Sequence, residues 1–129
     1  MEILIVDNDQ DDTAIYKEIL LSFDNTIEII IANDGIEALS LFHSSDYRPD
    51  LVLLDHDLPR MHCSKFLKKL RMEPDLKNMF VVVLSTVCSD GDLNLFHSLG
   101  TVCHTKPAAF GEMEDLLKKI LESVPGKRT

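Results

Sequence analysis

Apolar and polar residues alternate along this chain in blocks that recur about every 25 residues. Short apolar runs occupy residues 3–6, 27–32, 51–54 and 80–84, and a weaker run occupies residues 101–105. The first four runs consist mainly of Val, Ile and Leu without alternating polar positions, which is typical of parallel strands covered on both faces. The pattern therefore predicts five β-strands.

The segments between these runs show the spacing of amphipathic helices. Apolar residues recur there at intervals of three or four, at Ile15, Ile19 and Phe23, at Ile36, Leu39 and Phe42, at Phe66 and Leu70, and at Leu93, Phe96 and Leu99. The clearest stripe comes last and consists of Met113, Leu117, Ile120 and Val124. Such spacing places side chains on one face of a helix. The sequence thus predicts a helix after each strand.

Strands and helices that alternate five times predict an α/β fold, a (βα)5 doubly wound parallel sheet. Parallel strands need crossover connections, and these are nearly always right-handed. For five such units the usual strand order is 2-1-3-4-5, which places the topological switch point between the first and third strands. Ligands bind there, beyond the carboxyl ends of the strands. Residues 1–124 form one domain in this interpretation, and residues 125–129 form a short tail without an output domain.

Polar side chains follow four of the predicted strands. Asp7 comes after the first strand, Asp55 after the third, Ser85 after the fourth and Lys106 after the fifth. Asp7 and Asp55 flank the predicted switch point, so their carboxylates should face each other. Like charges at such a distance raise the pKa of one carboxylate unless a cation neutralises them. Because the available ligands are oxygen atoms, Mg²⁺ is the cation that suits this site.

These residue types are sufficient for phosphoryl transfer to a carboxylate. Carboxylates are known nucleophiles in the formation of aspartyl phosphates, which gives Asp55 the role of acceptor. Bound Mg²⁺ would reduce the repulsion between the acceptor and the incoming phosphoryl group. Lys106 would place a positive charge near the phosphoryl oxygens, and Ser85 would donate a hydrogen bond to them.

In sequence order, these residues resemble the motifs of bacterial response-regulator receiver domains. The resemblance covers the whole chain and is carried by Asp7, by Asp55 within PDLVLLDHDLPRM, by Ser85-Thr86 and by Lys106-Pro107. It implies a flavodoxin-like (CheY-like) fold of the single-domain type. It also implies that Asp55 accepts a phosphoryl group from a sensor histidine kinase or a phosphotransfer protein. The domain would signal to a downstream protein through protein–protein contacts, with no enzyme activity beyond self-phosphorylation and autodephosphorylation.

The resemblance implies further roles for individual residues. The Mg²⁺ ligands would be Asp7, Asn8, Asp55 and the backbone carbonyl of Asp57. The groups that contact the phosphoryl group would be Ser85, Thr86 and Lys106. The peptide bond before Pro107 would be cis, a geometry that X–Pro bonds tolerate.

The sequence departs from the family pattern at several positions, of which Asn8 and Cys103 bear directly on the switch; the stretch from Gly100 to Lys106 is also one residue shorter than usual, and Cys63 replaces a common glycine. Asn8 stands where receivers usually carry a second acidic ligand, and its amide oxygen would coordinate Mg²⁺ without charge, so the affinity should be weaker. Cys103 takes the position where many receivers have an aromatic side chain whose rotation reports phosphorylation. These departures leave open a receiver-like interaction module that works without phosphorylation.

A further alternative is a phosphatase of the haloacid dehalogenase type. Asp7 would be its nucleophile and Asp9 its acid and base, because the two follow an apolar first strand as a DxD motif. That class also needs a late acidic pair and a cap insertion, and it gives Asp55 no role. Asp9 is equally well interpreted as the N-cap of a helix.

Charge and hydropathy exclude other classes. The chain has 13 Lys and Arg residues against 22 Asp and Glu residues, a formal net charge of −9. Nucleic-acid phosphates bind clustered basic side chains, so a nucleic-acid partner is not expected. No apolar run approaches the roughly 18 residues needed to cross a bilayer, and the N-terminus lacks a basic signal-peptide start. A cytoplasmic location without membrane contact is therefore expected.

Cysteine and histidine residues suggest no metal site. Cys63, Cys88 and Cys103 are odd in number and form no CxxC pair, which predicts buried thiols in a reducing compartment, with a Cys88–Cys103 disulfide as an alternative. The neighbouring pairs His62-Cys63 and Cys103-His104 lack the spacing of a structural zinc site. His56, next to the acceptor, is expected to be an ordinary solvated loop residue.

Overall fold

A parallel sheet of five strands forms the centre of the computed structural model, which describes residues 1–126. Its strand order is β2-β1-β3-β4-β5, and every neighbouring pair is parallel. The predicted sheet and its order are thereby confirmed. The strands are β1 (Glu2–Val6), β2 (Glu28–Ala32), β3 (Leu51–Asp55), β4 (Val81–Ser85) and β5 (Val102–Thr105). Residues 127–129 of the predicted tail lie outside the described residues.

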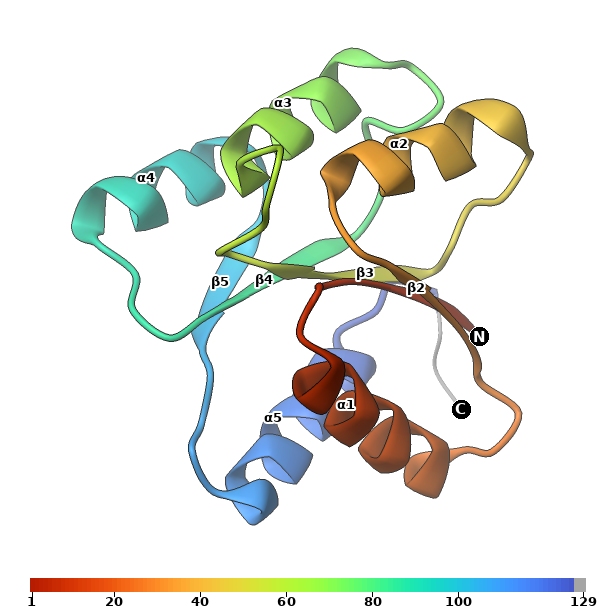
Figure 1. Cartoon of the computed structure of the whole chain (residues 1–129), viewed down its shortest axis with the longest axis vertical. Helices are drawn as coiled ribbons and strands as arrows, with labels where there is room; N and C mark the ends of the chain where they lie inside the picture. Colours follow the sequence, from red (N-terminus) through yellow and green to blue (C-terminus); the bar gives the residue numbers. More distant parts are fainter. Residues whose placement is uncertain (127–129) are drawn as a thin grey trace.

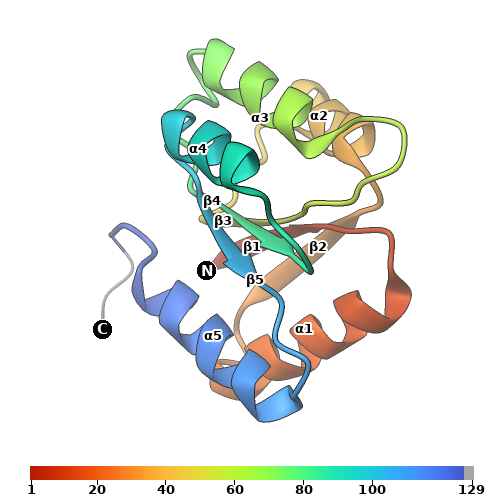
Figure 2. The ribbon, with the colours of Figure 1, turned by 90° about the vertical axis from the view of Figure 1, so that its left-hand side faces the viewer.

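One helix follows each strand, and the helices cover both faces of the sheet. Helices α1 and α5 lie on one face, and α2, α3 and α4 lie on the other (Figure 1, Figure 2). This arrangement confirms the predicted doubly wound (βα)5 fold. The helices are α1 (Gln10–Phe23), α2 (Gly35–Ser44), α3 (Cys63–Met72), α4 (Asp90–Ser98) and α5 (Phe110–Glu122). No helix within residues 1–126 combines the length and the apolar character needed to cross a membrane.

The central strands contribute side chains to two separate halves of the core. In β1, Leu4 and Val6 pack into the half beneath α2, α3 and α4, whereas Ile3 and Ile5 pack into the half beneath α1 and α5. Successive side chains of a strand point to opposite faces of the sheet. Both faces of these strands therefore need apolar residues, which explains why their sequences lack polar alternation.

Both edge strands are partly exposed, and for β2 this differs from the sequence prediction. Ile30 of β2 is 40% exposed, although the apolar run at 27–32 predicts a strand covered on both faces. That prediction is wrong for β2, because an edge strand has a neighbouring strand on one side only. Val102 of β5, at the opposite edge, is 52% exposed.

The helices differ in how well the predicted stripes match their buried faces. The stripe predicted for the last helix is buried throughout, at Met113, Leu117, Ile120 and Val124. In α1 the prediction is partly wrong, because Ile15 and Phe23 are 38% and 39% exposed while Tyr16, Ile19 and Leu20 are buried. A helix has 3.6 residues per turn, so residues spaced by four drift around its surface, and the two ends of the stripe leave the core.

Candidate functional site

The carboxyl ends of two neighbouring strands carry the first two carboxylates of the site. Asp7 follows β1, and Asp55 is the last residue of β3. Both residues are buried, with exposed fractions of 2% and 8%. The amide N–H of Asp7 donates to the carbonyl of Ala32 at 3.0 Å, and Oδ1 of Asp7 accepts the amide N–H of Asp9 at 2.9 Å. The sheet thus holds both carboxylates at its switch point.

Lys106 brings a positive charge to these carboxylates from the end of β5. Its Nζ donates to Asp55 Oδ1 at 3.0 Å and to Asp12 Oδ2 at 3.1 Å. Its backbone N–H donates to the carbonyl of Ser85 at 2.7 Å, which anchors the residue beside the end of β4. Burial by itself would lower the pKa of Lys106, but the interactions with the two aspartates outweigh it and raise the pKa above its ordinary value. The ammonium group therefore remains charged.

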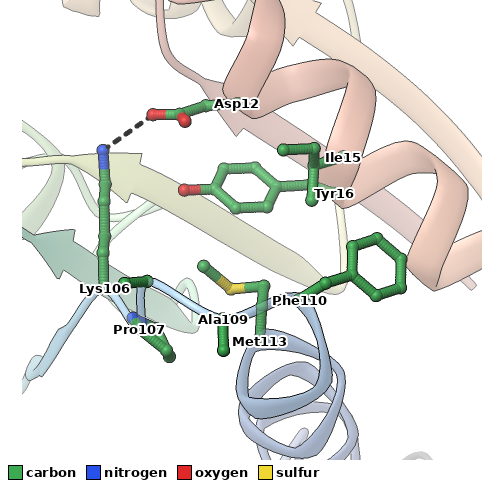
Figure 3. Close-up of a pocket in the computed structure, with 9 residues that line it drawn as sticks. Asp12, Ile15, Tyr16, Lys106, Pro107, Ala109, Phe110 and Met113 are labelled. Carbon is green, nitrogen blue, oxygen red and sulfur yellow. Dashed lines mark hydrogen bonds and ion pairs between the residues drawn. The ribbon is translucent and has the colours of Figure 1, made fainter.

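Asp12, in the first turn of α1, belongs to the site although the sequence analysis does not single it out. The N-cap of α1 is Asp9, whose Oδ1 accepts the amide N–H groups of Asp11 and Asp12 at 2.9 and 3.2 Å. This confirms the N-cap interpretation of Asp9. The Asp12 side chain points toward Lys106 (Figure 3). Its sequence signal is its place in the first helical turn after β1, at the same edge as the strand ends.

A pocket opens beside Lys106, between α1 and the start of α5. Figure 3 shows that Lys106 and Tyr16 line it together with the apolar side chains of Phe110 and Met113. The hydroxyl of Tyr16 is buried, and no group of residues 1–126 forms a hydrogen bond with it. Burial raises the pKa of Tyr16 above its ordinary value, so the hydroxyl stays protonated. Lys106 and Asp12, the two partners of an ion pair, both line this pocket.

Negative charge exceeds positive charge at this site. Asp7, Asp12 and Asp55 supply three carboxylates, and Lys106 is the cation that contacts two of them. Burial raises the pKa of Asp7 to about 6; the hydrogen bond from Asp9 opposes this rise, and the charges of Asp55 and Asp12 add to it. A surplus of carboxylate oxygens fits a hard divalent cation such as Mg²⁺.

The two other residues of the implied ligand set, Asn8 and Asp57, are exposed. The side chain of Asp57 is 75% exposed. Asp9 does not replace the charge that is missing at Asn8, because its carboxylate caps α1. A metal ion at this site would therefore meet fewer acidic ligands than the family pattern implies.

The hydroxyl of Ser85 bonds to its own loop. Ser85 is 1% exposed, and its Oγ donates to the carbonyl of Val87 at 2.6 Å. The neighbouring Thr86 is exposed. For Ser85 to bond a phosphoryl group on Asp55, as the sequence predicts, its hydroxyl has to leave Val87.

Comparison with known proteins assigns this arrangement to a family. The sequence profile of the response regulator receiver domain matches residues 3–119. This chain belongs to the response regulator receiver domain family. It is accordingly a receiver domain of two-component response regulators, as the motifs at the strand ends predict.

Two named proteins show the extent of the similarity. The response regulator Rcp1 of Synechocystis sp. is 29% identical over 123 residues, which cover 92% of this chain and 82% of Rcp1. The crystal structure of the phosphorylated cyanobacterial phytochrome response regulator RcpA matches with a TM-score of 0.88 at 29% identity, covering 99% of this chain and 96% of that one. The crystal structure of the Mn²⁺-bound form of Rcp1 matches with a TM-score of 0.85 at 28% identity. The match covers 98% of this chain and 96% of that one.

In this receiver domain the peptide bond before Pro107 is trans. All peptide bonds within residues 1–126 are trans, so the prediction of a cis bond there is wrong. The trans form of an X–Pro bond is favoured by roughly 0.5–1 kcal/mol. Lys106 reaches both Asp55 and Asp12 with the trans bond in place, so its position does not require the less stable isomer.

His56 is packed into the receiver domain, so the prediction of a solvated loop residue is wrong. Its side chain is 12% exposed, and its ring meets the ring of Phe96 edge-on, with 5.9 Å between the centroids. Its two ring nitrogens each lie 3.4 Å from a carboxylate oxygen, one of Asp57 and one of Asp92. His56 thus connects the segment after the acceptor strand with the first turn of α4.

His56, His62 and Cys63 offer metal-ligand atoms that lie within 4.8 Å of one another. Nδ1 of His62, however, accepts the amide N–H of Ser64 at 3.1 Å as the N-cap of α3. Burial raises the pKa of the Cys63 thiol to about 12, so the thiol is protonated at neutral pH. These contacts give the cluster a structural role at the start of α3.

The three cysteines are free thiols. Cys63 is buried, whereas Cys88 and Cys103 are partly exposed and pack against the core half beneath α2, α3 and α4. Cys103, at the position where the resemblance implies an aromatic readout, donates from its thiol to Sγ of Cys88 at 3.2 Å. The disulfide that the sequence leaves open is not formed in this structure, but its two sulfur atoms are in contact.

Proposed function

We propose that Asp55 of this receiver domain accepts a phosphoryl group from the phosphohistidine of a kinase or phosphotransfer protein. A carboxylate oxygen of Asp55 forms the new bond to phosphorus, while the bond between phosphorus and the donor imidazole breaks. The observation that carries this proposal is the contact between Lys106 Nζ and Asp55 Oδ1 at 3.0 Å, at the switch point of the sheet. The phosphorylated state of the similar protein RcpA supports the same chemistry here.

Two side chains of the site act directly on the phosphoryl group or its acceptor, and a third lies beside them. Lys106 faces the acceptor oxygen and offsets the negative charge that the phosphoryl oxygens bring. Ser85 exchanges its bond to Val87 for a bond to the phosphoryl group, and this exchange couples phosphorylation to the segment between β4 and α4. Thr86 is exposed next to Ser85 and follows the movement of that segment.

The oxygen donors at the ends of β1 and β3 are the proposed Mg²⁺ ligands. They are Asp7, Asn8, Asp55 and the backbone carbonyl of Asp57. When bound, the ion supplies positive charge that lowers the repulsion between acceptor and phosphoryl group. The raised pKa of Asp7 and the surplus of carboxylates support this assignment, as does the Mn²⁺-bound form of the similar Rcp1. Asn8 makes the proposed site weaker than one with two acidic residues in sequence.

Residues 1–124 are proposed to act as a cytoplasmic phosphorelay component that signals by protein–protein contact. Its phosphoryl donor would be a sensor histidine kinase or a phosphotransfer protein, and its target another protein. The net charge of −9 disfavours contact with nucleic acid or with an anionic membrane surface. The proposed chemistry of the domain itself is limited to self-phosphorylation and autodephosphorylation.

Intact mass spectrometry after incubation with acetyl phosphate and Mg²⁺ tests the proposed acceptor. We expect the wild-type chain to gain the mass of one phosphoryl group and Asp55→Asn to gain none. The matched control is Asp75→Asn, which makes the same change at an exposed position and should be phosphorylated like the wild type. An unmodified wild type would instead support the phosphorylation-independent interaction module, and labelling of Asp55→Asn would remove Asp55 from the role.

A chromogenic phosphomonoester tests the phosphatase alternative. That reading makes Asp9 an acid and base, but the Asp9 carboxylate accepts the amide N–H groups of Asp11 and Asp12 as a helix cap. We expect no turnover above background. Turnover that disappears in Asp7→Asn would support the phosphatase.

A further inference from the structure

Two thiols meet beside the segment that links the acceptor site to α4. Cys103 lies in β5, where it is in register with Val83 of β4. Cys88 lies in the short segment between the end of β4 at Ser85 and the start of α4 at Asp90. The Cys103 thiol donates to Sγ of Cys88 at 3.2 Å, across 15 residues of sequence. Sheet pairing thus holds one sulfur in place, and the loop brings the other to it.

The geometry and exposure of this pair favour covalent linkage. A disulfide has an S–S distance of about 2.05 Å, so the sulfurs need to approach by only about 1.2 Å from their separation of 3.2 Å. Cys88 belongs to an irregular segment, which moves more readily than a paired strand. Both thiols are partly exposed, whereas Cys63 is buried and provides an internal reference.

We propose that Cys88 and Cys103 form a modification site for small disulfides such as oxidised glutathione, which convert the pair to an intramolecular disulfide that restrains the segment between β4 and α4. The effect of this restraint on phosphorylation rests on the proposed function of Asp55. The formation of the disulfide between Cys88 and Cys103 does not depend on that function.

The reaction is a pair of thiol–disulfide exchanges. The thiolate of Cys88 attacks one sulfur of oxidised glutathione, an S–S bond forms to Cys88, and one glutathione thiolate leaves and takes up a proton. The Cys103 sulfur then attacks Sγ of Cys88 as its thiol proton passes to the departing glutathione sulfur, and the S–S bond between Cys88 and the second glutathione breaks. Two protein thiols are oxidised to one disulfide, and one glutathione disulfide is reduced to two thiols.

Cys88 is assigned the first step because its sulfur accepts the hydrogen bond. The Cys103 thiol is the donor of that bond, and burial raises the pKa of Cys103 to about 12, with the contact to Cys88 adding to the rise. Cys103 therefore retains its proton, and the first attack is assigned to Cys88, whose Sγ accepts the hydrogen bond. Cys103 is assigned the second step, in which it displaces glutathione from Cys88, because its sulfur already contacts Sγ of Cys88.

The disulfide would act on the phosphorylation switch through the backbone. Ser85 donates to the carbonyl of Val87, the residue directly before Cys88. Tying Cys88 to β5 holds that carbonyl in place and favours the conformation in which the Ser85 hydroxyl faces away from the acceptor. Loss of one hydrogen bond to the phosphoryl group lowers the rate of phosphorylation by about five-fold.

The first experiment incubates the purified chain with oxidised glutathione and follows intact mass and peptide mapping. We expect the wild type to lose two hydrogens and to yield a linked peptide that contains Cys88 and Cys103. Cys103→Ser should instead accumulate a stable glutathione adduct on Cys88, and Cys88→Ser should react much more slowly. Cys63→Ala, the matched control, should form the same disulfide as the wild type. A wild type that forms no internal disulfide overturns the proposal.

The second experiment compares phosphorylation of the reduced and oxidised wild type by acetyl phosphate. We expect the oxidised form to react about five-fold more slowly and to recover after treatment with dithiothreitol, while Cys88→Ser shows no effect of the oxidant. Equal rates in both forms overturn the restraint on the switch. If the reduced protein is not phosphorylated at all, the proposed function fails, but the mass measurement still decides whether the thiol pair is a modification site.

Discussion

The Lys106 ammonium donates a 3.0 Å hydrogen bond to Oδ1 of Asp55, although 51 residues separate the two in sequence. The same ammonium contacts Asp12 at 3.1 Å, so one cation forms ion pairs with a carboxylate of α1 and a carboxylate of β3. The electrostatic balance of the site therefore depends on this side chain, and its removal should affect stability as well as phosphorylation.

Lys106→Met removes the charge but retains most of the side chain. Asp55 and Asp12 then lose their shared cation, and we expect the free energy of unfolding at neutral pH without Mg²⁺ to fall by about 2 kcal/mol. Addition of Mg²⁺ should restore part of this loss. Urea denaturation followed by circular dichroism measures both effects. Lys68→Met, at an exposed position of α3, should change the stability by less than about 0.5 kcal/mol. Equal stability of wild type and Lys106→Met would contradict the electrostatic role.

The raised pKa of Asp7 predicts that this carboxyl group destabilises the fold as it ionises. The group titrates at about 6 in the folded state against 3.8 as the ordinary value. Between these values the folded state binds more protons than the unfolded state, so stability falls as pH rises. The contribution of Asp7 is fully present below pH 3.8 and is lost as pH rises through 6. Its size is about 2 kcal/mol after allowance for partial solvation.

Comparison of wild type with Asp7→Asn between pH 4 and pH 7 isolates this contribution, because the other carboxyl groups are the same in both proteins. We expect the Asn variant to gain stability relative to the wild type as pH rises, in buffers without divalent cations. Asp75→Asn, at an exposed position, should run parallel to the wild type. Parallel curves for Asp7→Asn as well would show that burial does not raise the pKa of Asp7.

Asn8→Asp should strengthen Mg²⁺ binding. The substitution replaces an amide with a carboxylate of the same size and so adds a negative charge next to Asp7. We expect the affinity for Mg²⁺ to rise about ten-fold. Isothermal titration calorimetry measures the difference. Asn78→Asp, an identical change at an exposed position in the turn after α3, should leave the affinity unchanged. An unaltered affinity for Asn8→Asp would remove position 8 from the proposed ligand set.

Asp34 should stabilise the fold through two separate interactions. Its Oδ1 accepts the amide N–H of Glu37 at 2.9 Å as the N-cap of α2, and its Oδ2 accepts from Nε of Arg60 at 2.6 Å. Asp34→Ala removes both, and we expect a loss of about 3 kcal/mol in the free energy of unfolding. Asp34→Ser keeps a capping oxygen and should lose about half as much. Equal losses in the two variants, measured by urea denaturation, would show that the cap makes no separate contribution.

The sequence by itself determined the architecture and the edge of the sheet on which the chemistry lies. Apolar runs without polar alternation mark the strands, and helical spacing marks the segments between them, because both periods are local properties of the backbone. Helical crossovers between successive strands make the strands parallel, so the carboxyl ends of all of them lie at one edge of the sheet. For that reason Asp7, Asp55 and Lys106 could be assigned to a common site before any distance was known, and the structure brings them together.

Only the tertiary structure decided which other side chains reach that edge. Asp12 meets Lys106 across 94 residues of sequence because the first turn of α1 lies at the same edge of the sheet as the residue that follows β5. The segment before α4 likewise decides whether Cys88 meets Cys103. The segment before α3 decides whether His56 is buried. Hydrophobic periodicity predicts roughly which face of a helix is buried. The exact rotation of the helix and its distance from the sheet are set by side-chain packing. Polar contacts of about 3 Å depend on both quantities.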